Sequence, residues 1–391
     1  MARKKICIAT GTRAEWGLLS PIACELQQRE DTDLQIVVTN MHLNPRYGHT
    51  VDEITDQGFA VNARVDMSLP GPDTDTGLSK VRAMALCSDG MAKALSKLDP
   101  DLLVILGDRY EMLSTATAAM MLGIPIAHIH GGEITLGAID NNIRHAITKM
   151  ASLHLTSTEA YRNRVIQMGE SPERVINTGA IGVYNAMNTP VIPRQELESS
   201  IGMKLDRDTI LLTYHPVTLD RERPSVRFRA ILDAIDRRQD LKVLITYPNN
   251  DAGGREIIAM IEEYSRMHSG RVTAVPSLGM RRYLSSLHYI GAVVGNSSSG
   301  IIEVPSAGIP TVNIGIRQKG RVSAESVIHC GDSADEIYNA LETAMSDKFR
   351  QEAAHTPNPY FRPDTLQSIV KSLTECDIPR FDEKTFYDLN D

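Results

Sequence analysis

The chain has 391 residues, of which 42% are hydrophobic and 23% are charged, a composition typical of a globular protein with a sizeable core. The 41 basic and 49 acidic residues give a net charge of −8. This balance argues against broad affinity for nucleic acid, which requires a basic face that displaces counterions. At roughly 100–200 residues per domain, the length predicts two or three domains.

The cysteines and the apolar stretches indicate the compartment. Five scattered cysteines lack any C-x-x-C spacing, which predicts reduced thiols in a reducing environment. The first residues, MARKKICIAT, hold too few apolar side chains for the hydrophobic region of a signal peptide. The longest apolar stretch elsewhere, AAMMLGIPIA, is about half a membrane span. We therefore expect a cytoplasmic protein with neither a membrane nor a nucleic acid as its partner.

Short apolar runs alternate along the chain with segments of helical spacing. The expected strands cover residues 4–10, 34–40, 102–108, 125–131, 153–158, 209–215, 242–248, 272–276, 292–296, 310–315 and 326–330. Nearly continuous apolar runs are typical of strands buried on both faces of a sheet. Helical spacing is clearest over residues 78–98 and 226–238. This alternation predicts a doubly wound α/β fold with parallel sheets.

The alternation is interrupted between about residues 184 and 205, where two prolines and few strand formers predict a linker with a short helix. We expect an N-terminal domain over residues 1–184 and a C-terminal domain over 185–364. The remaining segment, 365–391, begins with a helix and is a candidate to pack back on the N-terminal domain. Ligands of open α/β sheets bind beyond the carboxyl ends of the strands, so the cleft between two such domains is the expected site.

The first strand ends in TGTRAEWG, where Gly11 permits a tight turn and Arg13 adds a cation at a helix N-terminus. The segment lacks the G-x-G-x-x-G pattern, which argues against a nicotinamide dinucleotide. We expect Arg13 to bind an anion rather than to form a surface salt bridge. The strand over 102–108 leads into GDRYE, where Asp108 and Arg109 either pair with each other or divide the work on a proton or sugar and on a phosphate.

The next strand gives HIHGGE, in which His128 and His130 are two residues apart and are expected on the same side of an extended strand. Because no third ligand follows a matching pattern, we expect no metal there. In GAIDNNIRHAITKM, residues 141–151 are expected to be helical. Asp140 is then either an N-cap or a site residue, with Arg144 four residues on.

In the second half, polar groups again follow the expected strands, namely His215, Asn249, the serines of GNSSSG, Arg317 and Arg321. GNSSSG is neither a P-loop, since no G-K-[ST] follows, nor a G-x-S-x-G elbow. A helix with Glu303 near its start is expected after the serines, and its N–H groups with the hydroxyls resemble a phosphate cradle. With Glu303 on a ribose and Arg317 on a diphosphate, the predicted ligand is a substituted nucleoside diphosphate.

These motifs together resemble the hydrolysing UDP-N-acetylglucosamine 2-epimerases of the bacterial sialic-acid pathway, which are related to the epimerase domain of the bifunctional animal enzyme. The matching pieces, spread over residues 11–321, are GTRAEWG, GDRYE, HIHGGE, IDNNIRHAITKM, HPVT, YPNNDAG, GNSSSGIIEV and RQKGR. The resemblance implies a GT-B fold of two Rossmann-like domains, a nucleotide-sugar substrate and no cofactor. It also implies a homodimer or a homotetramer.

The resemblance further implies roles for single residues. UDP contacts are implied for Arg13, Arg109, His215, Asn249, Ser297, Ser298, Glu303 and Arg317. The implied catalytic residues are Asp108, the residue at 130, Asp140 and His215, with Arg144, His145 and Arg321 in support. Many relatives have a glutamate where His130 stands, so either His130 or Glu133 is expected to do its proton work.

The chemistry of such a substrate constrains the reaction. The C2 proton of an N-acetylhexosamine is not acidic, so the diphosphate must depart early and leave oxocarbenium-like charge at C1. Loss of the C2 proton then gives a glycal, and water adds back, so that UDP-N-acetylglucosamine would yield N-acetylmannosamine and UDP. The rival interpretations are a UDP- or GDP-linked diacetamido-trideoxy sugar as substrate, a non-hydrolysing epimerase, a GT-B glycosyltransferase and a non-catalytic nucleotide-sugar-binding protein.

Overall fold

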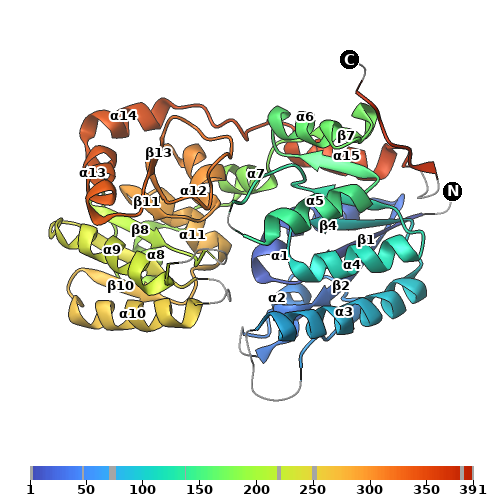
Figure 1. Ribbon diagram of the computed structural model, residues 1–391, viewed down its shortest axis with the longest axis horizontal. Coiled ribbons are helices and arrows are strands. Elements are labelled where there is room, and N and C mark those ends of the chain that lie inside the picture. Colours follow the sequence, from blue (N-terminus) through green and yellow to red (C-terminus); the bar gives the residue numbers. More distant parts are fainter. Residues whose placement is uncertain are drawn as a thin grey trace. The chain divides into compact units, whose positions relative to one another are not determined.

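The computed structural model describes residues 3–45, 48–69, 76–136, 138–217, 222–248, 253–378 and 383–389. The chain forms two compact units (Figure 1). The first unit contains Met1–Glu133, Asp140–Ile181 and Arg362–Asp391, and the second contains Ile134–Ile139 and Gly182–Phe361. Each unit is therefore completed by a segment that is distant from it in the sequence.

The first unit is built on a seven-stranded parallel sheet in the order β3-β2-β1-β4-β5-β6-β7. Its strands are β1 (Lys4–Thr10), β2 (Thr32–Thr39), β3 (Ala63–Val65), β4 (Leu102–Leu106), β5 (Ile126–Ile129), β6 (Leu153–Thr156) and β7 (Val175–Asn177). In register, Ile6 of β1 pairs with Leu34 of β2 and Leu102 of β4. Because the strands are parallel, their carboxyl ends lie along one edge of the sheet.

The strand order reverses between β1 and β4, so right-handed crossovers place the helices on both faces of this sheet. The helices of the unit are α1 (Arg13–Gln28), α2 (Val51–Asp56), α3 (Gly77–Leu98), α4 (Tyr110–Met121), α5 (Asp140–Met150), α6 (Glu159–Gln167) and α15 (Thr365–Glu375). Helices α3, α4 and α5 share one hydrophobic core with the strands. Helix α15 packs against α1, which brings the C-terminal segment onto the first unit.

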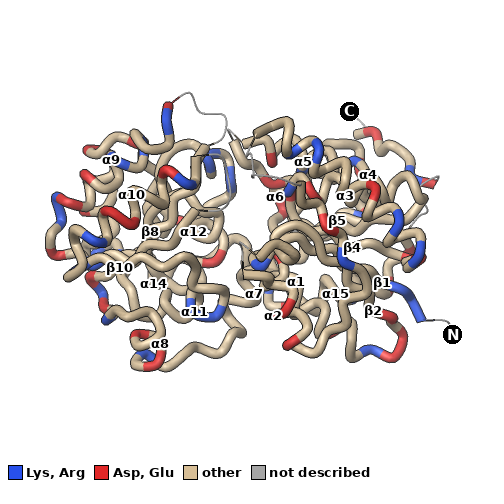
Figure 2. Tube along the Cα trace, turned by 90° about the horizontal axis from the view of Figure 1, so that it is seen from below, with Lys and Arg blue, Asp and Glu red and all other residues tan. Residues whose placement is uncertain are grey.

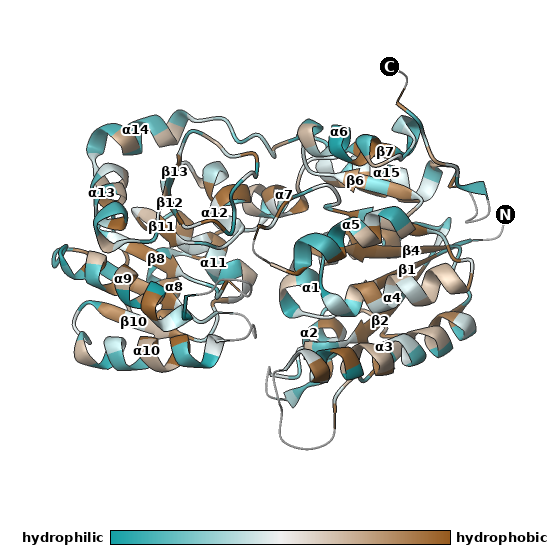
Figure 3. Cartoon of the chain, in the orientation of Figure 1, coloured by the Kyte–Doolittle hydropathy of each residue, from teal (hydrophilic) through white to brown (hydrophobic). Residues whose placement is uncertain are grey.

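The second unit repeats this order in a six-stranded parallel sheet, β10-β9-β8-β11-β12-β13. Its strands are β8 (Thr209–Thr213), β9 (Lys242–Thr246), β10 (Val272–Val275), β11 (Ala292–Gly295), β12 (Thr311–Ile314) and β13 (Val327–Cys330). Its helices are α7 (Ile181–Asn188), α8 (Arg194–Ile201), α9 (Pro224–Asp236), α10 (Gly254–Met267), α11 (Gly279–Leu287), α12 (Ser299–Ile302), α13 (Ala334–Met345) and α14 (Asp347–His355). Figure 3 shows the apolar colour concentrated on the strands, with hydrophilic residues on the outer sides of the helices.

The predicted fold class is confirmed, and each of the expected strands lies within two residues of an observed one. The sequence missed β3 and β7, which are three-residue strands at the two edges of the first sheet. The expected linker holds α7 and α8 instead of a single short helix. Helix α8 buries Leu197 and Ile201 in the core of the second unit, so this segment is part of a folded unit.

The distribution of charged and hydrophilic residues on the helices agrees with burial of only one side of each helix. Charged residues of both signs occur on outer helices such as α9 and α10 (Figure 2). Across the stretches that the structure describes, no helix is long and apolar enough to cross a membrane.

Candidate active site

The turn after β1 holds a buried carboxyl group. Thr12 caps α1 by accepting from the N–H of Glu15, and the Glu15 carboxylate accepts from the N–H groups of Gly11 at 2.7 Å and Thr12 at 3.2 Å. Burial, reinforced by the neighbouring Glu111, raises the pKa of Glu15 to about 8. A Cβ atom at Gly11 would lie 2.7 Å from a carboxylate oxygen of Glu111, so only glycine fits this turn.

The two arginines of the predicted site have partners within the first unit. Arg109 Nε donates to Glu111 Oε1 at 2.6 Å, and Asn40 Nδ2 donates to the same oxygen at 2.7 Å. Arg109 therefore pairs with Glu111 and not with its neighbour Asp108. Arg13 forms an ion pair with Glu53 at 3.0 Å. We expected Arg13 to bind an anion rather than to form a surface salt bridge, but the salt bridge is present in this structure.

Asp108 forms an ion pair with Arg144 of α5, whose side chain is 4% exposed. Behind this pair lies His128, which the sequence did not single out as a site residue. His128 Nε2 lies 2.7 Å from the carbonyl oxygen of Gly107, and Nδ1 lies 3.1 Å from Thr148 Oγ1 of α5. Burial lowers the pKa of His128 to about 3. Because a carbonyl only accepts, Nε2 carries the proton, and His128 links the Asp108 turn to the helix of Arg144.

The expectation that His128 and His130 face the same side of a strand was wrong. Strand β5 ends at Ile129, and His130 adopts a left-handed backbone with φ of 68°. This turn directs His130 Nδ1 to Glu133 Oε1 at 2.7 Å. Ser157, which follows β6, donates to the same carboxylate oxygen at 2.7 Å. The two candidates between which the sequence could not decide therefore form one hydrogen-bonded pair.

The second ring nitrogen of His130 is buried and makes no hydrogen bond to a described residue. His130 is 8% exposed, and its Nε2 has no hydrogen-bond partner among the residues that the structure describes. With Nδ1–H donated to the Glu133 carboxylate, Nε2 holds the lone pair. This is the arrangement in which a carboxylate fixes the tautomer of a catalytic imidazole.

Helix α5 begins at Asp140 itself, so Asp140 lies in the first turn and is not the N-cap. One turn further on, His145 is half-buried. Burial, together with the nearby charges of Arg144 and Arg164, lowers the pKa of His145. Asp140, Arg144 and His145 therefore share the N-terminal half of the helix that pairs with Asp108.

In the second unit, His215 follows β8 and is 7% exposed. Burial, together with the charge of Arg317, lowers the pKa of His215 to about 3, so its imidazole is neutral. Arg317, which follows β12, donates from one guanidinium nitrogen to the carbonyl of Asn296 at 3.2 Å. The strand ends of β8, β11 and β12 thus bring His215, Asn296 and Arg317 together.

The serine segment follows β11 as predicted, but the helix after it is short. Helix α12 has four residues and continues as the 3₁₀ turn Val304–Ala307. Glu303 lies at the end of α12 and not near its start, which corrects the sequence interpretation. A helix of one turn has only a small dipole, so anion binding here would depend on N–H groups, hydroxyls and Arg317. Ser299 Oγ donates to the Tyr283 hydroxyl at 2.7 Å, which fixes the third serine.

Arg321 joins the second unit to the segment Ile134–Ile139. Its Nε donates to the carbonyl of Ile134 at 2.8 Å, and a terminal nitrogen donates to Thr135 Oγ1 at 3.2 Å. Arg321 therefore fixes the position of the segment that directly follows Glu133. Ser297 and Ser298 are half-buried. Asn249 lies outside the described residues.

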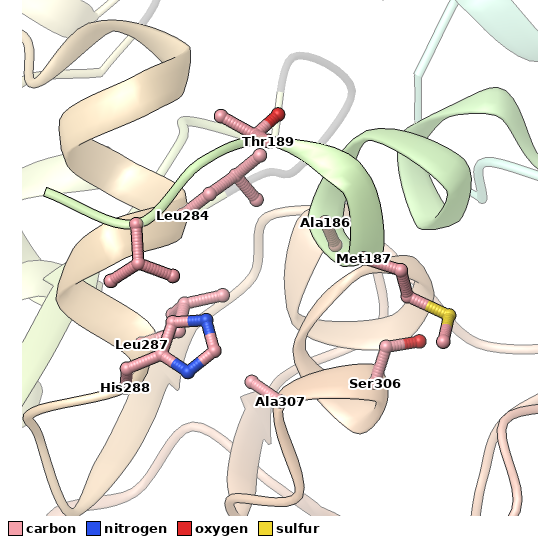
Figure 4. Close-up of a pocket in the computed structure, with 9 residues that line it drawn as sticks. Ala186, Met187, Thr189, Leu284, Leu287, His288, Ser306 and Ala307 are labelled. Carbon is pink, nitrogen blue, oxygen red and sulfur yellow. The ribbon is translucent and has the colours of Figure 1, made fainter.

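The second unit also contains a cavity of about 200 Å³ (Figure 4). Its lining residues are Ala186, Met187, Thr189, Val191, Leu284, Leu287, His288, Ser306 and Ala307. Leu287 and His288 lie five and four residues before the start of β11, and Ala307 lies four residues before the start of β12. The cavity therefore lies at the amino ends of these strands, opposite the serines, and is smaller than typical ligand pockets of about 300–1,000 Å³. No group of three His, Cys, Asp or Glu side chains suited to a metal ion occurs within the described parts of the chain.

Comparison with known proteins identifies the family of this chain. The sequence profile of a family described as UDP-N-acetylglucosamine 2-epimerase matches residues 24–374. The chain is 36% identical to the GDP/UDP-N,N'-diacetylbacillosamine 2-epimerase (hydrolyzing) of Campylobacter jejuni, over 100% of both chains. It is also 36% identical to the polysialic acid biosynthesis protein P7 of Escherichia coli, over 99% of this chain and 98% of that protein.

Solved structures show the same fold. The UDP-GlcNAc 2-epimerase of Neisseria meningitidis, solved bound to UDP-GlcNAc, superposes with a TM-score of 0.77 at 16% identity, over 94% of this chain and 99% of that one. The two parallel-sheet units of the present chain thus have the GT-B fold that the sequence predicted.

Proposed function

This chain belongs to the UDP-N-acetylglucosamine 2-epimerase family, and from that premise we propose that it is a hydrolysing 2-epimerase of a nucleotide-linked 2-acetamido sugar. The observation that carries this proposal is the His130–Glu133 pair, which offers one buried imidazole nitrogen without a described partner beside a fixed carboxylate. The 36% identity to a hydrolysing relative over the whole chain supports release of the nucleotide.

The second unit is proposed to bind the nucleotide. Ser297, Ser298 and Arg317 lie at neighbouring strand ends, where they would donate hydrogen bonds and positive charge to the diphosphate as it departs. Neutral His215 would donate a hydrogen bond to the same diphosphate. It would not compete with the residues of the first unit for the transferred proton. Glu303 is proposed to accept the hydroxyls of the ribose. Asn249 completes the proposed set from the resemblance alone.

The first unit is proposed to handle the protons. His130 Nε2 accepts the C2 proton once the diphosphate has left, and Glu133 stabilises the imidazolium that forms. Asp108, held by Arg144, is proposed to act on the opposite face of C2. Asp140, at the start of the helix that carries Arg144, is proposed to assist it. Arg13 and Arg109 are proposed to give up part of their pairing with Glu53 and Glu111 to the anionic substrate.

In this reaction the C1–O bond to the diphosphate breaks first, and the electron pair leaves with UDP. Loss of the C2 proton then forms the C1–C2 double bond of a 2-acetamidoglycal. Water adds its oxygen to C1, and a proton returns to C2 on the opposite face. The atoms balance as nucleotide sugar plus water giving UDP and the manno-configured sugar.

Two substrates stand as candidates for this chain. UDP-N-acetylglucosamine fits the sequence motifs, and its product would serve the synthesis of sialic-acid-type sugars, as the name of the Escherichia coli relative suggests. The Campylobacter jejuni relative, equal in identity, is named for UDP- or GDP-linked N,N'-diacetylbacillosamine. These sugars differ at C4 and C6, whereas the proposed proton chemistry takes place at C1 and C2.

The experiment is incubation with each nucleotide sugar in D₂O, followed by ³¹P and ¹H NMR. We expect free UDP or GDP and a manno-configured sugar that carries deuterium at C2, and the ratio of kcat/KM values identifies the preferred sugar. A mixture of two intact UDP-sugars would instead indicate the non-hydrolysing reaction. Unchanged UDP-N-acetylglucosamine, together with unchanged UDP-linked and GDP-linked N,N'-diacetylbacillosamine, would contradict the enzymatic proposal.

A further inference from the structure

Asn296, which directly follows β11, makes five hydrogen bonds to residues at two other strand ends. It is 1% exposed. Its side-chain oxygen accepts from the N–H of His215 at 2.7 Å, and its side-chain nitrogen donates to the carbonyl of His215 at 2.8 Å. The side chain therefore pairs with both backbone groups of a single residue, much as a neighbouring strand would.

The main chain of Asn296 makes the other contacts, and its N–H donates to the carbonyl of Thr213 at 3.2 Å. Its carbonyl accepts from Arg317 at 3.2 Å and from the side chain of Gln318 at 2.9 Å, and Gln318 is fully buried. The preceding Gly295 has φ of 134°, and a Cβ atom there would lie 1.9 Å from the carbonyl oxygen of Thr213. The chain thus turns away from β11 at a position that only glycine fits, which places Asn296 between the loops after β8 and β12.

We propose that Asn296 is the positioning residue of the nucleotide site, which holds the His215 loop, the serine segment and Arg317 in one arrangement around the diphosphate. This inference rests on the proposed function, because those three elements are the proposed ligands of the diphosphate. Asparagine is suited to the role because it offers one acceptor and one donor at the spacing of a peptide group. Alanine offers neither, and aspartate offers only acceptors.

The test is calorimetric titration of the whole protein with UDP and, separately, with GDP, so that no turnover is required. Asn296→Ala is expected to weaken binding of the preferred nucleotide about tenfold or more, because the groups that donate hydrogen bonds to the diphosphate are no longer held in one arrangement. Asn296→Asp keeps the acceptor for the N–H of His215 but adds a negative charge beside the diphosphate. We expect it to bind more weakly still, and to recover partly at high salt.

The matched control is Asn313→Ala. Asn313 is also 1% exposed, lies in the adjacent strand β12, and donates its side-chain nitrogen to His329 at 3.0 Å. It should lower Tm to a similar degree and leave nucleotide affinity unchanged. In a double-mutant cycle, Asn296→Ala and His215→Ala should weaken binding by less than the product of their separate effects, since the side chain of Asn296 acts through the position of His215.

Each result bears on the inference. Wild-type affinity in Asn296→Ala would overturn it and leave the proposed function standing. Affinity losses that follow Tm equally in Asn296→Ala and Asn313→Ala would also overturn it, because the role would then be structural. A wild-type protein that bound neither nucleotide would overturn the proposed function, and this inference with it.

Discussion

The two units share one strand order, and their strand ends differ in charge. In the first unit, charged groups after the strands pair with one another, and one partner of each pair is buried, as in Asp108–Arg144 and Arg109–Glu111. In the second unit, the residues after β8 and β11 are neutral, namely His215, Asn296 and the serines. Arg317 is the cation beside them.

We propose that this difference lets one scaffold support two tasks. Buried pairs hold carboxylates and imidazoles in fixed orientations, which proton transfer requires. Neutral hydroxyls and amides offer hydrogen bonds to a leaving diphosphate without competing charges. The fold provides the sheet edge where the strands end, and the side chains at that edge determine which chemistry takes place there. If the comparison holds, substitutions in the first unit should affect turnover and leave nucleotide affinity unchanged.

The largest effect is expected for Asp108→Asn. The substitution keeps the shape of the side chain and removes its capacity to exchange a proton, so kcat should fall by about 10³-fold. Dissociation constants for UDP from calorimetry should remain within about twofold of the wild-type value. Asp101→Asn is the control, because Asp101 lies just before β4 at the opposite edge and accepts from the N–H of Lys5. Equal losses of turnover and UDP affinity in Asp108→Asn would break the comparison.

A smaller loss is expected for Glu133→Gln. Without the carboxylate, the imidazolium of His130 loses its stabilising charge, so kcat should fall by about 10²-fold, the lower end of what acid–base catalysis contributes. Deuterium incorporation at C2, followed by NMR, should slow in parallel. Ser157→Ala removes only one donor to the same carboxylate and should cost less than Glu133→Gln. If Glu133→Gln retained full activity, the pair would have no role in proton transfer.

The sequence predicted the strands, the fold class and the clustering of polar residues at strand ends, because buried parallel strands have a strong local pattern. Edge strands such as β3 and β7 were not predicted because each has three residues of which only one is buried, which is too few to form such a pattern. The length of α12 was overestimated, since the helical spacing around Glu303 continues into a 3₁₀ turn at Pro305.

Partners within the site could not be predicted, because pairing depends on tertiary geometry. Asp108 and Arg109 are adjacent in sequence, yet each pairs with a different residue. His128 and Asn296 were missed because a buried histidine and a buried asparagine have no sequence spacing that marks them as positioning residues. For His128, the available signal was its place in HIHGGE, two residues before His130, which was already assigned to the site.

A pH-dependent effect on stability is expected from Glu15. Its pKa is raised to about 8 in the folded protein, so the folded state keeps a proton that the unfolded state releases above its ordinary pKa near 4.5. The free energy of unfolding should therefore fall as pH rises from 5 to 8, by up to about 1.4 kcal/mol per pH unit.

Glu15→Gln should flatten this slope, because glutamine is neutral at every pH. Urea titrations at pH 5, 6, 7 and 8 measure it. Glu25→Gln, on the exposed side of the same helix α1, is the control and should leave the slope unchanged. A slope that survived in Glu15→Gln would assign the titration to another group of the first unit.

The smallest effect is expected for Lys384→Met, far from the strand ends. Lys384 Nζ donates to Glu170 Oε2 at 2.9 Å and to the carbonyls of Lys149 and Ala151 at the end of α5. Glu170 also accepts from Lys149 at 2.6 Å and from His154 at 2.9 Å, so it keeps two partners when Lys384 is lost. The free energy of unfolding should fall by about 1–3 kcal/mol.

Because Lys384 supports α5 of the first unit, its loss should lower Tm and leave UDP affinity unchanged. Lys371→Met, exposed on α15, is the matched control and should change neither quantity. The informative outcome is a fall in UDP affinity that follows Tm in Lys384→Met. It would show that a defect in the C-terminal segment of the first unit reaches the nucleotide site, so that the two units could not be assigned separate tasks.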